Sequence, residues 1–347
     1  MENRMASTLV DWKKFHGDWF KDRRVLVTGG AGFIGSHLCE ALVVLGAKVV
    51  ALDDLSGGTW DNLQGFGDDV QAITGSIMDR AVVDKAVAGC DVVFHEAALG
   101  SVPRSVAEPS IYWQVNVVGT LNVLEAARHA QVKRLLFAGS SSAYGDPPGE
   151  GMKVETMPPL PRSPYAATKL AAEHALRAWY HSYGLDTCVL RYFNVFGPRQ
   201  NANSAYAAVI AAFAKALLSG KPGTIYGDGN QSRDFTFVAN VVHGNLLAAR
   251  HSSSLCGDVY NVATGGCVSV NELYFKMLAI MGRELSAPVY LSARRGDVLR
   301  SQSDINNAMQ VLGYETLVDF DHGLAKTMAW YRGQQNLIAM AGANSSN

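Results

Sequence analysis

The stretch RVLVTGGAGFIGSHLCEALVVLGAKVVALD, from Arg24 to Asp53, decides the fold. It begins with the β-branched run Arg24–Val27, passes through a glycine-rich turn and an apolar, helix-compatible segment, and closes with a second buried run over 48–52. A strand, a glycine turn, a helix and a strand within roughly thirty residues form the βαβ unit that binds a dinucleotide. We therefore predict an α/β protein with a Rossmann-like, doubly wound parallel sheet that starts here.

The glycines of the turn, Gly29, Gly32 and Gly35, have three different tasks in such a unit. The first allows the tight turn, the second lets the backbone approach a pyrophosphate, and the third lets the helix pack on the strand. The helix N-terminus then offers unpaired N–H groups and a partial positive charge to the phosphates. Asp53 follows about 20 residues later, where a carboxylate holds the adenosine ribose hydroxyls and repels a 2′-phosphate. The sequence thus predicts NAD, in preference to NADP.

Composition is that of an ordinary globular protein. The chain has 347 residues, of which 48% are hydrophobic and 18% charged, with a formal net charge of −1. This balance leaves no electrostatic footprint for nucleic acid or an anionic membrane. The five cysteines are scattered and lack CxxC spacing. Neither a metal site nor a disulfide framework is therefore expected, and a reducing compartment is. No apolar run reaches the ~18 residues of a membrane span, and charged side chains between Glu2 and Lys14 exclude a signal-peptide core. We predict a cytoplasmic enzyme.

Strand-like and helix-like segments alternate along the first two hundred residues. Alternation with crossovers of this length predicts a parallel sheet with right-handed connections, whose ligands bind beyond the carboxyl ends of the strands. The further strands are expected at 70–74, 91–95, 134–138 and 187–190, and the helices at 78–88, 111–130 and 164–183.

The domain prediction has four parts. An N-terminal helical extension is expected over 1–23 and the dinucleotide-binding domain over 24–196. From 197 to 335 the βαβ order is lost, which indicates a smaller mixed α/β substrate-binding lobe interleaved with the end of the sheet. Residues 336–347 are expected to fray.

A serine, a tyrosine and a lysine form the chemical constellation. In Tyr165-Ala-Ala-Thr-Lys169 the phenol and the ammonium are at i and i+4, on one face of a helix. A phenol has a reference pKa of roughly 10, and a nearby ammonium and an oxidised nicotinamide both favour the phenolate. Lowering the pKa by about three units needs about 4 kcal/mol. Ser140, at the end of a predicted strand, can hydrogen-bond the substrate oxygen that Tyr165 deprotonates. This set suits hydride transfer from a secondary alcohol.

At this level of detail the chain resembles an extended short-chain dehydrogenase/reductase of the nucleotide-sugar 4-epimerase group. The resemblance covers about residues 20–320. Its motifs are Thr28–Gly35, Asp53, 116–120, Ser140–Gly145, Pro164–Lys169, Arg191–Pro198 and Gly227–Phe235. Within the group the chain is most similar to the UDP-N-acetylglucosamine 4-epimerases of surface-polysaccharide synthesis, through Leu99–Ser105, Gly197–Gln200 and Ala205–Ile210.

The resemblance implies a mechanism. Tyr165 removes the sugar 4-hydroxyl proton while the C4 hydride passes to tightly bound NAD. The 4-keto intermediate then turns about its diphosphate linkage, and the hydride returns to the opposite face. Lys169 lowers the pKa of Tyr165 and holds the nicotinamide ribose, and Ser140 orients the 4-oxygen.

The resemblance also implies two sets of binding residues. The cofactor set is Gly29, Gly32, Phe33, Ile34, Gly35, Asp53, Ser56, Gly57, Ser76, Ile77, Ala97, Asn116, Tyr165, Lys169 and Phe193. The UDP-sugar set is Ser101, Ser140, Ser141, Ser142, Tyr165, Asn194, Val209, Tyr226, Arg233, Arg294, Asp297 and Ser301. Relatives of this kind commonly pair as homodimers through helices equivalent to 111–130 and 164–183. For His95, at a strand end, a structural role is favoured over a catalytic one.

Substrate choice depends on one position of the matched motifs. Ser301 stands where epimerases restricted to glucose and galactose carry a tyrosine, and a small side chain leaves room for an N-acetyl group. Activity on UDP-GlcNAc and UDP-GalNAc is therefore expected, with UDP-Glc and UDP-Gal as further substrates.

Ser141 and Ser142 occupy the positions where 4,6-dehydratases need an Asp-Glu pair, which argues against dehydration. An epimerase of UDP-glucuronate or UDP-N-acetylglucosaminuronate stays open, and a non-catalytic NAD-binding regulator is less favoured. Three positions depart from the family pattern, Ser76, Glu96 and Asn240.

Overall fold

The computed structural model describes residues 9–146, 151–202, 208–282, 287–293 and 299–344. Its centre is a seven-stranded sheet in the order β11-β6-β5-β4-β1-β2-β3, and all neighbouring strands are parallel. The strands are β1 (Arg24–Thr28), β2 (Lys48–Asp53), β3 (Val70–Thr74), β4 (Val92–His95), β5 (Arg134–Ser140), β6 (Thr187–Tyr192) and β11 (Asp258–Val262). The predicted doubly wound fold is confirmed. Strand order reverses between β1 and β4, and this switch point is where such sheets bind ligands.

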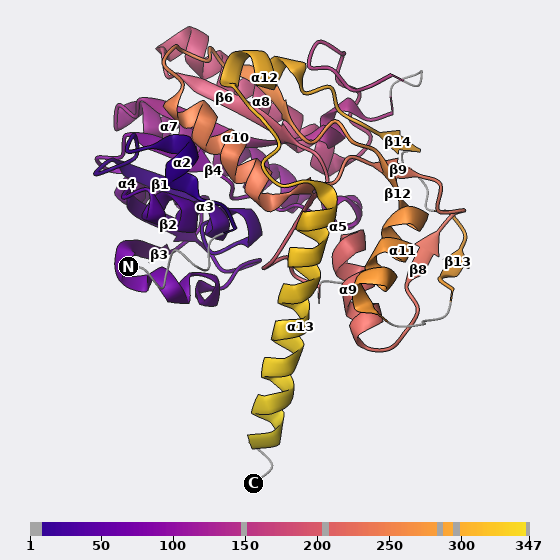
Figure 1. Cartoon of the computed structure of the whole chain (residues 1–347). Helices are drawn as coiled ribbons and strands as arrows, with labels where there is room; N and C mark the ends of the chain where they lie inside the picture. Colours follow the sequence, from indigo (N-terminus) through magenta and orange to yellow (C-terminus); the bar gives the residue numbers. More distant parts are fainter. Residues whose placement is uncertain (1–8, 147–150, 203–207, 283–286, 294–298, 345–347) are drawn as a thin grey trace.

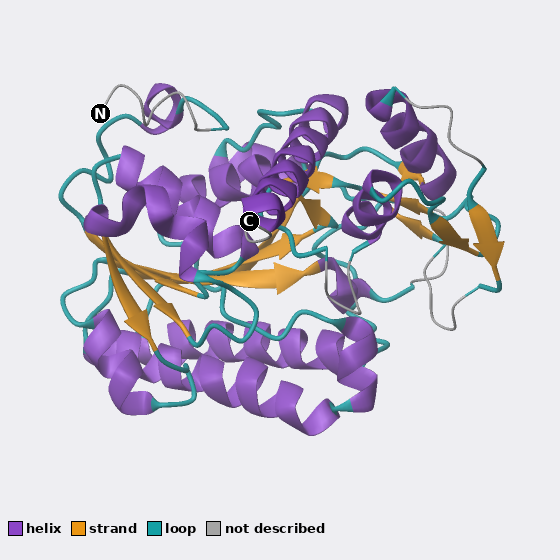
Figure 2. Ribbon diagram, turned by 90° about the horizontal axis from the view of Figure 1, so that it is seen from below, coloured by secondary structure: helices purple, strands orange, loops and turns teal. Residues whose placement is uncertain are grey.

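Helices cover both faces of the sheet, as Figure 2 shows. One layer contains α3 (Phe33–Val44) and α10 (Val238–Arg250), and the other contains α4 (Arg80–Val87), α7 (Thr120–His129) and α8 (Pro164–Tyr183). Side chains alternate between the two faces of each strand. In β1, Val25 and Val27 accordingly belong to one buried cluster and Leu26 to the other.

The segment predicted as one helix over 111–130 is helical but irregular. It consists of α6 (Pro109–Tyr112), a π-helical stretch, η2 (Trp113–Gly119), and then α7. Single π turns inside helices are frequent at functional sites, and this one holds Asn116. The short helix α5 (Val102–Ala107) precedes this irregular segment.

Beyond β6 the chain builds small sheets and two helices beside the carboxyl ends of the strands (Figure 1). The helices are α9 (Val209–Leu218) and α11 (Val270–Met281). The short strands are β7 (Val195–Phe196), β8 (Thr224–Tyr226), β9 (Ser232–Arg233), β10 (Thr236–Phe237), β12 (Val268–Ser269), β13 (Val289–Leu291) and β14 (Arg300–Ser301). β9 lies between β12 and β14, which brings Arg233 and Ser301 into register. The strand-like stretch 233–238 is therefore divided between β9 and β10, which belong to different sheets.

Both ends of the described chain are helical. At the N-terminal end, α2 (Trp12–His16) contacts α3 and leads to Phe20, and both Trp12 and Phe20 are part of the main core. At the other end, α12 (Asn306–Leu312) precedes α13 (Phe320–Asn344), which extends away from the body in Figure 1. Helix α13 thus continues through residues 336–344, which were expected to fray. Among the described residues no helix has the length and apolarity needed to cross a membrane.

Candidate active site

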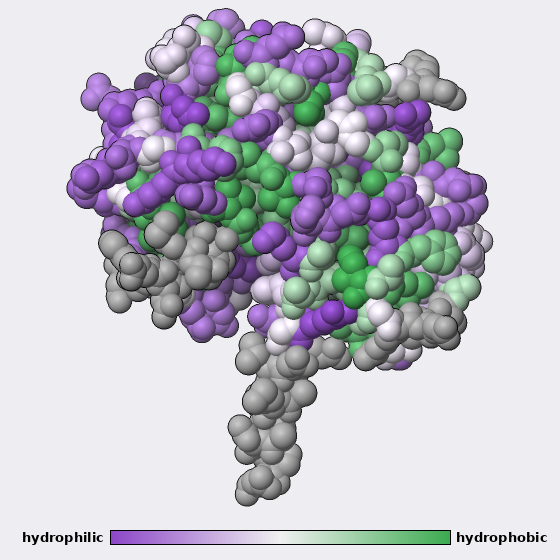
Figure 3. All heavy atoms as spheres, in the orientation of Figure 1, coloured by the Kyte–Doolittle hydropathy of each residue, from purple (hydrophilic) through white to green (hydrophobic). Residues whose placement is uncertain are grey.

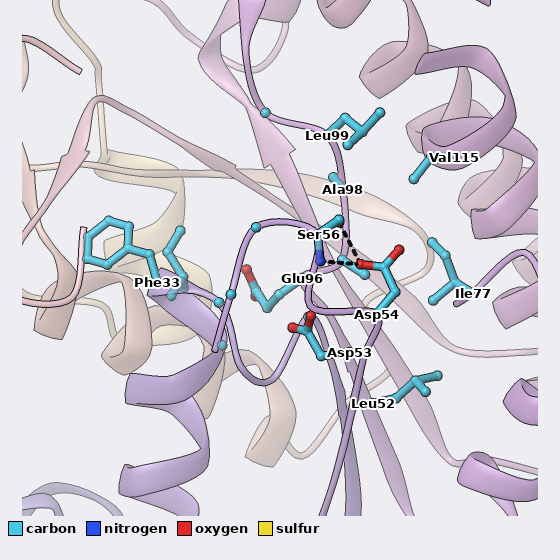
Figure 4. Close-up of a pocket in the computed structure, with 18 of the residues that line it drawn as sticks. Phe33, Leu52, Asp53, Asp54, Ser56, Ile77, Glu96, Ala98, Leu99 and Val115 are labelled. Atoms are coloured by element: carbon cyan, nitrogen blue, oxygen red, sulfur yellow. Dashed lines mark hydrogen bonds between the residues drawn. The ribbon is translucent and has the colours of Figure 1, made fainter. Parts of the chain in front are cut away.

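A cavity of about 680 Å³ opens at the carboxyl ends of β1, β2 and β4, at the switch point of the sheet. Figure 4 shows part of its lining, with Asp53, Asp54 and Glu96 around the glycine turn. Most of the predicted cofactor residues line this cavity, namely Gly29, Gly32, Phe33, Ile34, Gly35, Asp53, Ser56, Gly57, Ile77 and Ala97. The predicted substrate residue Ser101 lines it too.

The glycine turn leaves no room for side chains. Gly29 has φ +69°, and a Cβ there would lie 2.8 Å from the backbone nitrogen of Ala97. A Cβ on Gly35 would collide with the carbonyl of Gly29 at the start of α3. The backbone N–H of Gly29 donates to the carbonyl of Leu52 at 2.7 Å, which ties the turn to β2. A backbone cradle that only glycine fits, opening on a helix N-terminus, suits a pyrophosphate.

Asp53 closes the adenosine end of the cavity. Its carboxylate accepts backbone hydrogen bonds from Ala31 at 3.0 Å and Leu55 at 2.8 Å, which fixes its orientation. Burial raises the pKa of Asp53, and these two N–H groups oppose the rise. Asp54, also on the cavity wall, adds a second carboxylate at the same end. The residues present therefore fit NAD, because a 2′-phosphate would meet two acids here.

The catalytic constellation is assembled by α8 and β5. Ser163 caps α8, its hydroxyl accepting the N–H of Ala166 at 3.2 Å, and Pro164 begins the helix. This places Tyr165 in the first turn and Lys169 one turn later. Ser140 ends β5 and its hydroxyl lies 2.8 Å from the Ser142 hydroxyl. Ser140 is also close enough to Tyr165 to lower the pKa of the phenol by hydrogen bonding.

The two ionisable groups of the constellation are both perturbed by burial. The Lys169 ammonium donates to the carbonyl of Ala138 at 2.9 Å and lies 4.6 Å from the centre of the Phe137 ring. Burial lowers the pKa of Lys169 to about 8, against the opposing charge of Glu96. Loss of hydration raises the pKa of Tyr165, and the hydrogen bond from Ser140 opposes this. Lys169 is not among the protein groups that act most strongly on the pKa of Tyr165, and its ammonium is turned toward β5. That Lys169 lowers the pKa of Tyr165 stays a prediction.

A second cavity, of about 910 Å³, lies between the sheet edge and the C-terminal lobe. It shares Gly100 and Ser101 with the first cavity. Five predicted substrate residues line it, which are Ser101, Asn194, Val209, Tyr226 and Arg233. The two cavities meet beside the constellation. There the Tyr112 hydroxyl donates to the carbonyl of Ser101 at 2.7 Å, and the Tyr112 ring lies edge-on to Tyr165, with 6.4 Å between the centroids.

Three predicted cofactor residues support the cavity wall from behind. Asn116 is buried and its amide pairs with both backbone groups of Leu99, at 2.8 and 3.1 Å. The Ser76 hydroxyl accepts the N–H of Met78, before α4. Phe193 is fully buried against Tyr144. None of the three is among the lining residues of either described cavity, and their assignment to the cofactor stays a prediction.

Ser301 is buried in β14, behind the lining of the second cavity. Its hydroxyl lies 3.4 Å from the ammonium of Lys153, which also donates to the carbonyl of Gly145 at 3.2 Å. Burial lowers the pKa of Lys153 to about 8, and the charge of Arg233 acts in the same direction. Lys153 belongs to the Pro/Gly-rich loop after β5, and nothing in that loop marked it as a site residue. Arg294 and Asp297 lie outside the described residues.

His95 has the structural role that the sequence favoured. It is fully buried, and its ring nitrogens bond to the hydroxyls of Thr28 at 2.7 Å and Thr120 at 2.9 Å. Burial lowers the pKa of His95 to about 3, so the ring stays neutral. Within the described part of the chain, no group of three or more His, Cys, Asp or Glu side chains is placed to hold a metal ion.

Comparison with known proteins identifies the family. The sequence profile of the NAD dependent epimerase/dehydratase family matches residues 25–263. A UDP-glucose 4-epimerase of Mycolicibacterium smegmatis is 39% identical over 315 residues, covering 90% of this chain and 99% of the relative. This chain belongs to the NAD-dependent epimerase/dehydratase family.

Solved structures similar to this epimerase include members with different sugars. The UDP-N-acetylglucosamine 4-epimerase of Methanobrevibacter ruminantium M1, in complex with UDP-N-acetylmuramic acid, aligns with a TM-score of 0.86 and 41% identity. The UDP-glucuronic acid 4-epimerase of Bacillus cereus, in complex with UDP-glucuronic acid and NAD, aligns with a TM-score of 0.83 and 31% identity. Each alignment covers 90% of this chain and 99% of the other. The predicted family, fold, epimerase class and cofactor are thereby confirmed, while the roles of individual site residues stay predictions.

Proposed function

We propose that this epimerase interconverts UDP-GlcNAc and UDP-GalNAc at C4, with UDP-Glc and UDP-Gal as further substrates. The observation that carries the choice of sugar is Ser301. Its side chain is only a hydroxymethyl group, and it pairs in register with Arg233, which lines the second cavity. A tyrosine in the same place would fill the space that a rotating N-acetyl group needs.

The chemistry follows from the residues around the junction of the two cavities. When bound, NAD supplies the acceptor and donor of the C4 hydride. Tyr165 takes the proton of the sugar 4-hydroxyl and returns it after the 4-keto sugar has rotated. Ser140 orients the 4-oxygen, and Ser141 and Ser142 line the sugar site. Lys169 lies one turn along α8, and we assign its ammonium to the nicotinamide ribose of the bound dinucleotide.

The diphosphate and the base are assigned to the second cavity. The Arg233 guanidinium is on its wall and offers charge-assisted hydrogen bonds to the diphosphate. We propose that Arg294 and Asp297 act at the diphosphate and the uridine ribose. Val209 and Tyr226 lie on the wall of this cavity, and we assign them to the uracil.

An epimerase of UDP-glucuronate or UDP-N-acetylglucosaminuronate is the second candidate, and Lys153 favours it. A buried ammonium 3.4 Å from the Ser301 hydroxyl is chemically suited to a carboxylate on the sugar. The first candidate is preferred on the small size of Ser301, because a Lys153 with a pKa of about 8 keeps most of its charge at neutral pH and does not itself decide between the two sugars.

Ser301→Tyr, with Ser301→Ala as the matched control, tests the assignment. The tyrosine variant should lose activity on UDP-GlcNAc and UDP-GalNAc by about a hundredfold while UDP-Glc turnover stays within a few-fold, a discrimination of a few kcal/mol. The alanine variant should keep the wild-type preference. Product analysis with each UDP-sugar, including UDP-glucuronate, measures both. An unchanged preference in Ser301→Tyr contradicts the size argument, and turnover of the uronate alone selects the second candidate.

A further inference from the structure

Glu96 is an acidic side chain in the dinucleotide cavity to which the proposed mechanism gives no task. It follows β4 at the switch point of the sheet, and its backbone N–H donates to the carbonyl of Thr28 at 3.2 Å. Its side chain lines the cavity and lies beside the glycine turn in Figure 4. It is therefore in the wall that bound NAD would cover.

A hydrogen-bond chain holds the Glu96 carboxylate toward the catalytic end of this cavity. The Tyr192 hydroxyl donates to it at 2.7 Å, and the amide of Asn245 on α10 donates to Tyr192 at 2.8 Å. Tyr192 pairs in register with Ser140, so the anchor of Glu96 is next to the constellation. Asp53 and Asp54, the other acids of the cavity, belong to its adenosine end.

Glu96 and Lys169 act on each other electrostatically. Lys169 lowers the pKa of Glu96, whereas burial raises it, with a net value of about 7. The groups that face the carboxylate are Tyr192 from β6 and Lys169 from α8, with the amide of Asn245 behind Tyr192.

The charges of Glu96 and Lys169 act differently on the oxidised and the reduced dinucleotide. The reactive ring of the dinucleotide is positive when oxidised and uncharged when reduced. The positive charge of Lys169 alone disfavours the oxidised ring, and the negative charge of Glu96 on the cavity wall compensates for it. We propose that Glu96 sets the redox preference of the bound dinucleotide, its carboxylate favouring NAD over NADH. The epimerase is thereby returned to the oxidised form in which each catalytic cycle begins.

An exchange experiment with the holoenzyme measures this preference directly. The protein is equilibrated with a fixed mixture of NAD and NADH, approached from both directions. Free dinucleotide is then removed, and the released cofactors are quantified. A unit charge about 12 Å away, at an effective dielectric constant of about 20, predicts that Glu96→Gln shifts the bound ratio toward NADH by about tenfold at pH 8, and a shorter distance predicts a larger shift.

Asp54→Asn is the matched control, because it removes one carboxylate from the same cavity at the adenosine end. Its bound NAD:NADH ratio should equal that of the wild type. Lowering the pH from 8 to 6 should shift the wild type toward NADH more than it shifts Glu96→Gln, in which Lys169 titrates but Glu96 does not. A wild-type ratio in Glu96→Gln, or an equal shift in Asp54→Asn, would overturn the proposal.

Tyr192→Phe gives a second reading if Glu96→Gln does not fold. Loss of the hydroxyl that donates to the carboxylate favours protonated Glu96. The bound ratio should then shift toward NADH at pH 7 and return to the wild-type value at pH 9. A wild-type ratio at both pH values would count against the proposal. No sugar enters these measurements, so their outcome is independent of the proposed substrate.

Discussion

Tyr165 has to lose a proton at a place where the protein groups alone raise its pKa. Replacing it with phenylalanine removes the proposed general base and should lower kcat by about 10²–10⁴-fold. The dinucleotide content of the purified protein should stay unchanged, because Tyr165 is not in the described lining of the first cavity. Tyr112→Phe is the matched control. It removes a hydroxyl from the neighbouring ring, and we expect less than a tenfold loss of kcat. Unchanged turnover in Tyr165→Phe would refute the mechanism.

Some site residues could be predicted from the sequence and others could not. Asp53 and the glycines could be predicted, because strand, turn, helix and acid are neighbours in the chain. Lys153 could not, because its partner Ser301 is 148 residues away. The orientation of the Lys169 ammonium could not be predicted for a related reason. An i, i+4 spacing puts Lys169 on the same helix face, but the Ala138 carbonyl that turns its ammonium belongs to β5.

At the scale of elements, the N-terminal helix α2 is attached to α10 by hydrogen bonds of the His16 ring, and these bonds define which ring nitrogen carries the proton. Arg250 donates to Nδ1 of His16 at 3.2 Å, so Nε2 of His16 carries the hydrogen and donates to His243 at 3.1 Å. Both histidines have to stay neutral, because a further proton would face Arg250. Burial lowers the pKa of His16 to about 3 and that of His243 to about 4.

This contact predicts a pH dependence of stability. The pKa of His16 is lower in the folded than in the unfolded chain. The contribution of neutral His16 to the stability of the fold is therefore complete above pH 6.5. It is lost as the pH falls toward 3. His16→Gln should therefore reduce the slope of the unfolding free energy below pH 6.5 by up to about 1.4 kcal/mol per pH unit. His181→Gln, which changes an exposed histidine, should leave the slope as it is. Denaturant unfolding at several pH values measures both, and equal slopes in wild type and His16→Gln would contradict the assignment.

Elements with a regular hydrophobic period were predicted well, and irregular ones were not. The strands β1 to β6 and the helix α8 lie close to their expected positions, whereas β11 was not expected. The π-helical stretch within 111–130 leaves no signal in apolar spacing, because the segment stays helical throughout. The break between β9 and β10 occurs at Asp234, whose carboxylate accepts bonds from Thr264, Gly265 and Ser303. These partners are distant in the chain, so the break was not visible in the sequence.

The whole molecule combines a sheet that local patterns predict with a lobe that they do not. Successive βαβ units leave few choices for the strand order up to β6, since crossovers are right-handed and short. β11 then joins the sheet next to β6, after most of the small lobe has been built. Substrate residues such as Arg233 and Ser301 thus come from short strands paired across the lobe, where no period of hydrophobic residues marks them.

The assembly of the whole molecule is the last prediction. Residues 111–119 expose apolar side chains, with Ile111, Trp113 and Val118 at 38%, 45% and 45% exposure. Large exposed apolar groups on neighbouring turns mark interaction surfaces, and we propose that this face pairs two copies of the chain. Trp113→Glu would bury a charge there and should convert the dimer to a monomer. Phe275→Glu, at an aromatic residue 53% exposed on α11, should leave it intact. Light scattering during size exclusion measures the mass, and a monomeric wild type, or dissociation by both variants, would contradict this interface.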